Sequence, residues 1–270
     1  MKPWICALAG AVLALGSTLA QADSPVHHGV YVWHSQALLA PKTQDSELSD
    51  IQDYGIDQVY VGLNAQQAAD PDGTKAAIAS LVTEAARRDM QVYLLLGDPD
   101  WIFPENRSKL INLLAQLHPL NIKGLLLDIE IEQLKTPSLA DRYSLWEQTI
   151  SDVTRQSAWP ITTVSHWRWF ASDDHALLCL GSTGIRYASL MVYSTNLSVI
   201  RDKLAIAQSR CPGTRFSLSQ SVENMLAPEE TWSGKGSFAA IQNKIDLTLK
   251  DLPVVSIDWQ DWDHLKAMNH

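Results

Sequence analysis

The sequence predicts an α/β protein that forms a single-domain (β/α)8 (TIM) barrel. Eight short apolar runs rich in Val, Ile, Leu and Tyr alternate with amphipathic stretches at a regular pitch. Strands that alternate with helices pair in parallel through right-handed crossovers. Residues 23–270 are close to the ~250 residues typical of this barrel. An open doubly wound sheet is disfavoured because no Gly-rich phosphate turn follows the first run.

Residues 1–22 have the pattern of a cleaved signal peptide. Lys2 provides a positive start, Ile5–Leu15 is apolar, and Ala20-Gln21-Ala22 is an A-x-A cleavage site. We therefore expect a secreted or periplasmic protein in which residues 23–270 form the barrel. No later apolar run approaches ~20 residues, so no membrane anchor is expected.

The predicted strands coincide with the apolar runs, which are bounded by Gly, Pro, Asn or Asp. They are Gly29–His34, Gln58–Leu63, Gln91–Leu96, Ile122–Ile131, Ile161–His166, Tyr187–Tyr193, Arg215–Ser219 and Pro253–Trp259. Three longer helices are predicted to follow residues typical of helix N-caps. They are 75–88 after Asp72 or Thr74, 139–155 after Ser138, and 238–250 after Ser237.

Composition excludes several classes of protein. A hydrophobic content of 46% excludes disorder. A net charge of −9 argues against binding to nucleic acid or to an anionic membrane surface, both of which require a basic face. After cleavage only Cys179 and Cys211 remain, and they either pair or stay as buried free thiols. Their spacing predicts no zinc site, no cofactor motif is present, and we expect a monomer.

Carboxylates and tryptophans follow the ends of the predicted strands, where barrels of this class carry their active sites. Indole rings stack on the apolar faces of sugar rings and keep an N–H group free for hydroxyls. These tryptophans therefore predict a polysaccharide or oligosaccharide ligand. They are Trp33, Trp101, Trp167, Trp169, Trp259 and Trp262.

The fourth predicted strand carries the candidate catalytic pair. Side chains alternate along a strand, so one face points outward to the helices and comprises Leu125, Leu127, Ile129 and Ile131. The other face points into the barrel and comprises Gly124, Leu126, Asp128, Glu130 and Glu132. Two carboxyls in a confined site do not both ionise easily, so one pKa should rise, as a general acid requires near neutral pH.

This segment resembles the fourth-strand signature of family 18 glycoside hydrolases, D-G-x-D-x-D-x-E. Gly124, Asp128 and Glu130 match it, whereas Lys123 and Leu126 replace its first two aspartates. The M-x-Y-[DN] motif of the sixth strand matches at Met191-Val192-Tyr193 and departs at Ser194, and Trp259 ends the eighth strand as in that family. The third strand reads LLLGDPDW in place of S-x-G-G.

The resemblance implies a distantly related glycosidase acting on a polymer with N-acetylhexosamine units. Glu130 would be the general acid, while Asp128 would orient the N-acetyl group that attacks the anomeric carbon and Tyr193 would hydrogen-bond that group. We expect substrate contacts from the side chains at the strand ends. They are Trp33, Asp98, Trp101, Glu132, Trp167, Met191, Glu223 and Trp259.

Alternatives remain open at this point. Glu130 and Glu223 have the placement used by many retaining barrel glycosidases, with Glu223 as nucleophile. Asp98 or Asp258 could also supply the second carboxylate, and Glu223 could be a solvated loop residue. Because the fourth-strand signature is incomplete, the barrel could instead bind glycans without cleaving them. A metal-dependent deacetylase or lyase is a third possibility.

Overall fold

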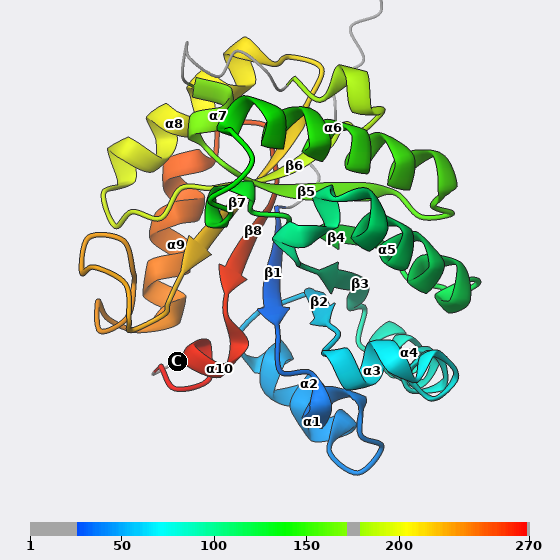
Figure 1. Ribbon diagram of the computed structural model, residues 1–270. Coiled ribbons are helices and arrows are strands. Elements are labelled where there is room, and N and C mark those ends of the chain that lie inside the picture. Colours follow the sequence, from blue (N-terminus) through cyan, green and yellow to red (C-terminus); the bar gives the residue numbers. More distant parts are fainter. Residues whose placement is uncertain (1–25, 172–178, 269–270) are drawn as a thin grey trace, which may run out of the picture.

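The computed structural model describes residues 26–171 and 179–268 and shows a closed parallel barrel of eight strands in chain order, as predicted (Figure 1). The predicted signal peptide lies outside the described residues. The strands are β1 His27–Val32, β2 Gln58–Gly62, β3 Gln91–Leu96, β4 Gly124–Leu127, β5 Ile161–His166, β6 Tyr187–Met191, β7 Arg215–Ser221 and β8 Val254–Gln260.

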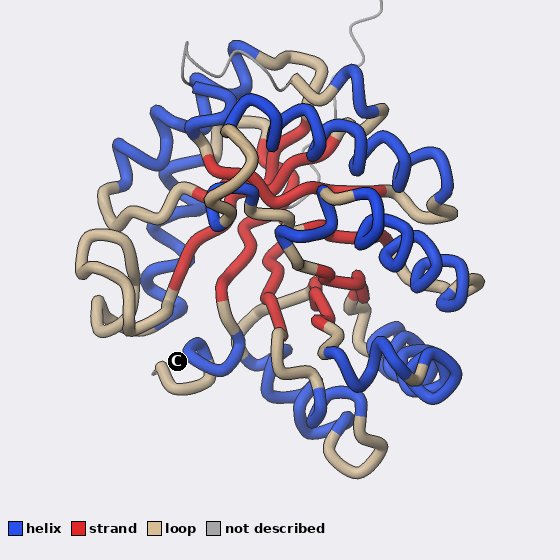
Figure 2. Tube along the Cα trace, viewed as in Figure 1, coloured by secondary structure: helices blue, strands red, loops and turns tan. Residues whose placement is uncertain are grey.

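Helices surround the strands on the outside of the barrel (Figure 2). The α-helices are α1 Gln36–Leu39, α2 Gln44–Asp53, α3 Ala65–Ala69, α4 Pro71–Ala86, α5 Pro104–Leu117, α6 Leu139–Gln156, α7 Arg168–Ala171, α8 Leu197–Arg210, α9 Phe238–Leu249 and α10 Trp262–Leu265. Short 3-10 turns are η1 Pro99–Ile102, η2 Ile131–Gln133 and η4 Gly181–Thr183. Within the two described ranges, none of the helices combines the length and the apolar character needed to cross a membrane.

The predicted helix starts are correct at two of three positions. Ser138 and Ser237 are the N-caps of α6 and α9. Helix α4 begins earlier than predicted, because Asp70 is its N-cap, with a side chain that accepts a 3.1 Å hydrogen bond from the Gly73 amide. Pro71 takes the first helical position, where its fixed φ and its missing N–H cost nothing.

Strand β4 is shorter than predicted, since it ends at Leu127 and not at Ile131. The Asp128 amide still donates to the carbonyl of Leu96, at 2.9 Å, but Leu96 is the last residue of β3. With no neighbouring strand to pair with, the chain continues as a loop into η2. The alternation nevertheless persists, because Ile129 and Ile131 are buried in the outer core beside Leu125 and Leu127.

The barrel interior has an apolar part and a polar part. Inward side chains form a small apolar cluster of Tyr31, Tyr60, Leu95, Leu126, Val164 and Met191. Asp258 on β8 is almost fully buried and accepts 2.9 Å hydrogen bonds from Tyr60 and from Ser189. A side chain at Gly29, next to Asp258 in the β1–β8 register, would place its Cβ 2.5 Å from the Asp258 carboxylate.

A disulfide joins Cys179 to Cys211, 32 residues apart, so the first of the two alternatives for these cysteines holds. It closes the loop that contains η4, β6 and α8. Crosslinking a loop of this length stabilises a protein by about 3–4 kcal/mol, chiefly by restricting the unfolded chain.

Replacing Cys179, whose side chain is exposed, by Ser is expected to lower the free energy of unfolding by about 3 kcal/mol. Urea unfolding followed by circular dichroism measures this change. The reduced unaltered protein is the matched control and should unfold at the same urea concentration as Cys179→Ser. Equal midpoints for the oxidised protein and Cys179→Ser would contradict the stabilising role.

Candidate active site

The loop after β4 holds Asp128 and Glu130 at the mouth of the barrel. Ile129 and Ile131 anchor this loop in the outer core, so Asp128 and Glu130, which alternate with them, turn inward. Arg142 on α6 donates a 2.5 Å hydrogen bond to the carbonyl of Ile131 and fixes the far end of the loop. The pair is therefore positioned by packing on one side and by a charged donor on the other.

Asp128 is buried, with 7% of its surface exposed, and its Oδ1 has no hydrogen-bond partner among the described residues. Burial, and after it the nearby charges of Glu130 and Glu132, raise its pKa to about 8. The carboxyl group is therefore predominantly protonated at neutral pH. Gly97 permits this enclosure, since a Cβ there would lie 2.9 Å from the Asp128 carbonyl oxygen and 3.0 Å from the Trp33 ring.

Glu130 is partly buried and also retains its proton more readily than a free glutamate. Burial and then the charge of Glu132 raise its pKa, and Glu223 adds a smaller contribution. Gln133 acts in the opposite direction by donating a 2.8 Å hydrogen bond to Glu130 Oε1. The Gln133 contact also fixes which oxygen of Glu130 remains free to act on a ligand.

Tyr193 and Glu223 share the electrostatic environment of the β4 pair. Burial raises the pKa of Tyr193 well above its ordinary value, and the charges of Asp128, Glu223 and Glu130 contribute to the rise. Ser221 holds Glu223 by donating a 3.1 Å hydrogen bond to its Oε2 and accepting one of 3.1 Å from its amide. Burial raises the pKa of Glu223 as well. The structure therefore brings together carboxyl groups from the ends of β4 and β7.

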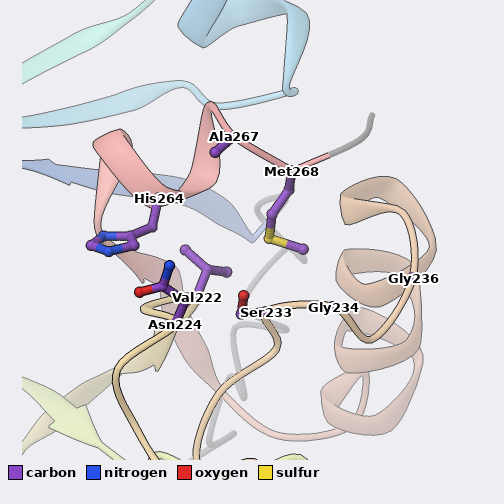
Figure 3. Close-up of a pocket in the computed structure, with 8 residues that line it drawn as sticks. All are labelled: Val222, Asn224, Ser233, Gly234, Gly236, His264, Ala267 and Met268. Atoms are coloured by element: carbon purple, nitrogen blue, oxygen red, sulfur yellow. The ribbon is translucent and has the colours of Figure 1, made fainter.

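The cavities in the described part of the molecule include two of about 290 Å³ each. One opens beside Glu130. The other, shown in Figure 3, lies between the loop after β7 and the C-terminal segment, and its lining contains no carboxylate. It is lined by Val222, Asn224, Ser233, Gly234, Gly236, His264, Ala267 and Met268. We therefore place the candidate active site at the first cavity and the adjoining barrel mouth.

Among the tryptophans predicted to contact sugar, Trp33 lies in the barrel mouth. It packs against the inner apolar cluster. Trp169 lines the cavity beside Glu130, but it is 2% exposed and its Nε1 donates to Glu132. These two rings are next to the carboxylates, and Trp33 is the one with a partly exposed face.

Two of the other four tryptophans are buried, which corrects the expectation that all six rings contact sugar. Trp259 is fully buried on the outward face of β8 against Phe238, and Trp262 is buried in the same outer core. Trp101 also packs against that core. Trp167 does so too, and Lys203 lies 3.7 Å from the centre of its ring.

The remaining predicted contacts differ in how they are placed. Met191, the last residue of β6, is 7% exposed and packs in the inner cluster against which Trp33 also lies. Asp98 caps η1 by accepting a 2.9 Å hydrogen bond from the Asp100 amide. Glu132 is exposed and lines the cavity. Asp258 lies in the barrel interior and is not at the mouth.

His166 and Gln260 are not among the predicted site residues. His166 lines the cavity beside Glu130, and Gln260 accepts a 3.0 Å hydrogen bond from the Tyr193 hydroxyl. The signal that could have found Gln260 is strand alternation, because Asp258 and Gln260 share the inward face of β8 and Trp259 lies on the other. Within the described residues, no group of three or more His, Cys, Asp or Glu side chains is arranged to hold a metal ion.

No protein-family model and no curated protein sequence matches the chain. Its fold is similar to that of the spore cortex-lytic enzyme SleL of Bacillus cereus, with a TM-score of 0.57, 11% identity, and coverage of 90% of this chain and 73% of that one. It is also similar to a GH5_18 protein from Streptomyces cattleya in complex with GlcNAc, with a TM-score of 0.59, 16% identity, and coverage of 87% of this chain and 70% of that one. For tamarind chitinase-like lectin the TM-score is 0.52 and the identity 7%, with coverage of 90% of this chain and 96% of that one. At these identities the likeness shows the fold.

Proposed function

We propose that the protein is a glycoside hydrolase that cleaves a polysaccharide or oligosaccharide containing N-acetylhexosamine, with Glu130 as general acid and Asp128 assisting. The observation that carries the proposal is the pair of carboxyls at the end of β4, both with raised pKa values. A carboxyl group that keeps its proton near neutral pH can protonate a leaving-group oxygen. The similarity in fold to a cortex-lytic enzyme and to a GlcNAc-bound GH5_18 protein supports the substrate class.

In the proposed first step, Glu130 transfers its proton to the glycosidic oxygen. The carbonyl oxygen of the substrate's own N-acetyl group forms a bond to the anomeric carbon as the bond from that carbon to the leaving oxygen breaks. Asp128, whose Oδ1 has no protein partner in the described chain, hydrogen-bonds the acetamido group and orients it. In the second step Glu130 removes a proton from the water that attacks the anomeric carbon, which restores the acetamido group and the general acid.

Tyr193 and Trp33 are proposed to complete the sugar site. Trp33 offers a partly exposed ring at the mouth, suited to stacking on a pyranose face. The Tyr193 hydroxyl donates to Gln260, so a contact in which it donates to the substrate requires that bond to be exchanged. Its lone pairs remain available to accept a hydrogen bond from the substrate without such an exchange.

A second route is favoured by one observation, the electrostatic contact between Glu223 and Glu130. In that route the Glu223 carboxylate attacks the anomeric carbon and forms a glycosyl-enzyme, which water then hydrolyses with Glu130 as base. Both routes retain the anomeric configuration, so product stereochemistry does not separate them.

The test uses the unaltered protein and Glu223→Ala with chitotetraose, and it measures reducing-end release and products formed with added sodium azide. We expect cleavage by both proteins, with less than about a ten-fold difference in kcat and no glycosyl azide. Large loss of activity in Glu223→Ala, restored by azide with formation of a glycosyl azide, would assign the nucleophile to Glu223. If the unaltered protein binds chitotetraose in isothermal titration but releases no reducing ends from it, the hydrolase proposal is rejected and the protein is a barrel that binds glycans without cleaving them.

A further inference from the structure

The cavity beside Glu130 lies between β4, β5 and α6 and has a volume of about 290 Å³. This is at the lower end of the range for small-ligand pockets, roughly 300–1,000 Å³, so it suits one ring and not a long chain. Glu130 forms part of its wall. A group that receives a proton from Glu130 would therefore be attached to whatever occupies this cavity.

His166 provides a hydrogen-bond donor of fixed orientation in this cavity. It is the last residue of β5 and follows the inward-facing Val164 by two positions. Its Nδ1 accepts a 3.1 Å hydrogen bond from the Arg168 amide, which assigns the ring proton to Nε2. Burial and the charge of Arg168 lower the pKa of His166 to about 4, so the imidazole stays neutral above pH 5.

The opposite wall of the cavity is largely apolar. Leu139 and Tyr143 come from the start of α6, and Trp169 follows β5. Tyr143 and Trp169 pack edge to face with ring centres 5.0 Å apart. Glu132 adds an acceptor carboxylate at the rim, held by the Trp169 indole N–H. The exposed Arg168 also lines the cavity. An apolar wall with polar donors and an acceptor matches a sugar ring, which has apolar C–H faces and hydroxyls at its edge.

We propose that this cavity binds the leaving-group sugar of the substrate, a neutral hexopyranose unit, and that His166 Nε2–H donates to one of its hydroxyls. The assignment rests on the proposed function, because a general acid must reach the oxygen that joins the two sugars on either side of the cleaved bond. Glu130 lines the cavity and is close enough to Glu223, at the end of β7, for the charge of that residue to act on it.

The experiment compares two substrates that differ only on the leaving-group side. Chitotetraose places a sugar in the cavity, whereas 4-nitrophenyl N,N′-diacetylchitobioside places an aryl group there with no hydroxyl to receive the His166 proton donor. We expect His166→Phe to lower kcat/KM for chitotetraose about ten-fold or more, mainly through KM, and to leave the aryl substrate within about two-fold. His166→Gln, which keeps an uncharged N–H donor, should recover part of the loss.

His118→Phe is the matched control, because His118 is exposed at the end of α5, away from the site. Thermal unfolding of each variant checks the fold, and His166→Ala supplies the same loss of donor if His166→Phe does not fold. Equal kcat/KM for chitotetraose in His166→Phe or His166→Ala and the unaltered protein, with the aryl substrate cleaved normally, would overturn the cavity assignment alone. Failure of the unaltered protein to cleave either substrate would overturn the proposed function, and the assignment with it.

Discussion

Glu130→Gln is expected to lower kcat for chitotetraose by about 10²–10⁴-fold, the usual contribution of a general acid, while the Kd changes little. Glutamine has the shape of a protonated glutamate but has no acidic proton to transfer. Gln133 donates to Glu130 Oε1, and the glutamine carbonyl oxygen can accept the same hydrogen bond. The substitution therefore removes proton transfer without removing the contact that orients the side chain.

Reducing-end release measures kcat, and isothermal titration measures binding. A substrate with a 2,4-dinitrophenyl leaving group, which departs without protonation, should lose much less activity than chitotetraose. Glu105→Gln is the matched control, since Glu105 is an exposed carboxylate on α5 outside the site. Unchanged turnover of chitotetraose by Glu130→Gln would reject its role as the acid.

Asp128→Asn is expected to stabilise the protein at alkaline pH and to have little effect near pH 4. The unfolded chain releases this proton near pH 3.8, whereas the folded protein retains it to about pH 8. Between these values the free energy of unfolding of the unaltered protein falls as pH rises, at about 1.4 kcal/mol per unit for a single group. Asparagine does not ionise, so this loss is absent, and the difference from pH 5 to pH 8 is on the order of 4 kcal/mol.

Urea unfolding at pH 5 and at pH 8.5, for the unaltered protein and for Asp128→Asn, gives the two free-energy differences. Asp72→Asn is the matched control, because Asp72 is exposed in the first turn of α4. Its effect should be small and the same at both pH values. A constant offset between the unaltered protein and Asp128→Asn at the two pH values would show that Asp128 titrates normally.

Strand alternation made much of the fold and part of the site predictable. Leu125 and Leu127 face the helices while Asp128 turns into the mouth, as their spacing requires. The same rule, applied to β8, places Asp258 inward and Trp259 outward. The prediction for Trp259 is wrong because a residue at the end of a strand faces the mouth only when its side chain is on the inward face, and the Trp259 ring is on the outward face.

The cavity could not be predicted because its walls come from segments that meet only in the folded chain. Tyr143 lies near the start of an amphipathic helix, where its spacing indicates ordinary packing. His166 ends a strand like several other polar residues, and its neutral state depends on burial and on the Arg168 backbone. The exact end of β4 likewise depends on where β3 stops pairing, at Leu96.

The unequal interior of the barrel has a consequence for acidity. Asp128 and Asp258 are both almost fully buried, yet their pKa values rise to about 8 and about 6. Asp258 accepts hydrogen bonds from hydroxyls, whereas Asp128 follows the strand of Leu126, where hydrocarbon takes the place of polar groups, and lies near the charges of Glu130 and Glu132. The polarity of the side chains beneath a carboxyl group therefore helps to set its pKa. Substitutions of inward side chains such as Leu126 would then change the pKa of a carboxyl at the mouth while every residue that touches the ligand stays the same.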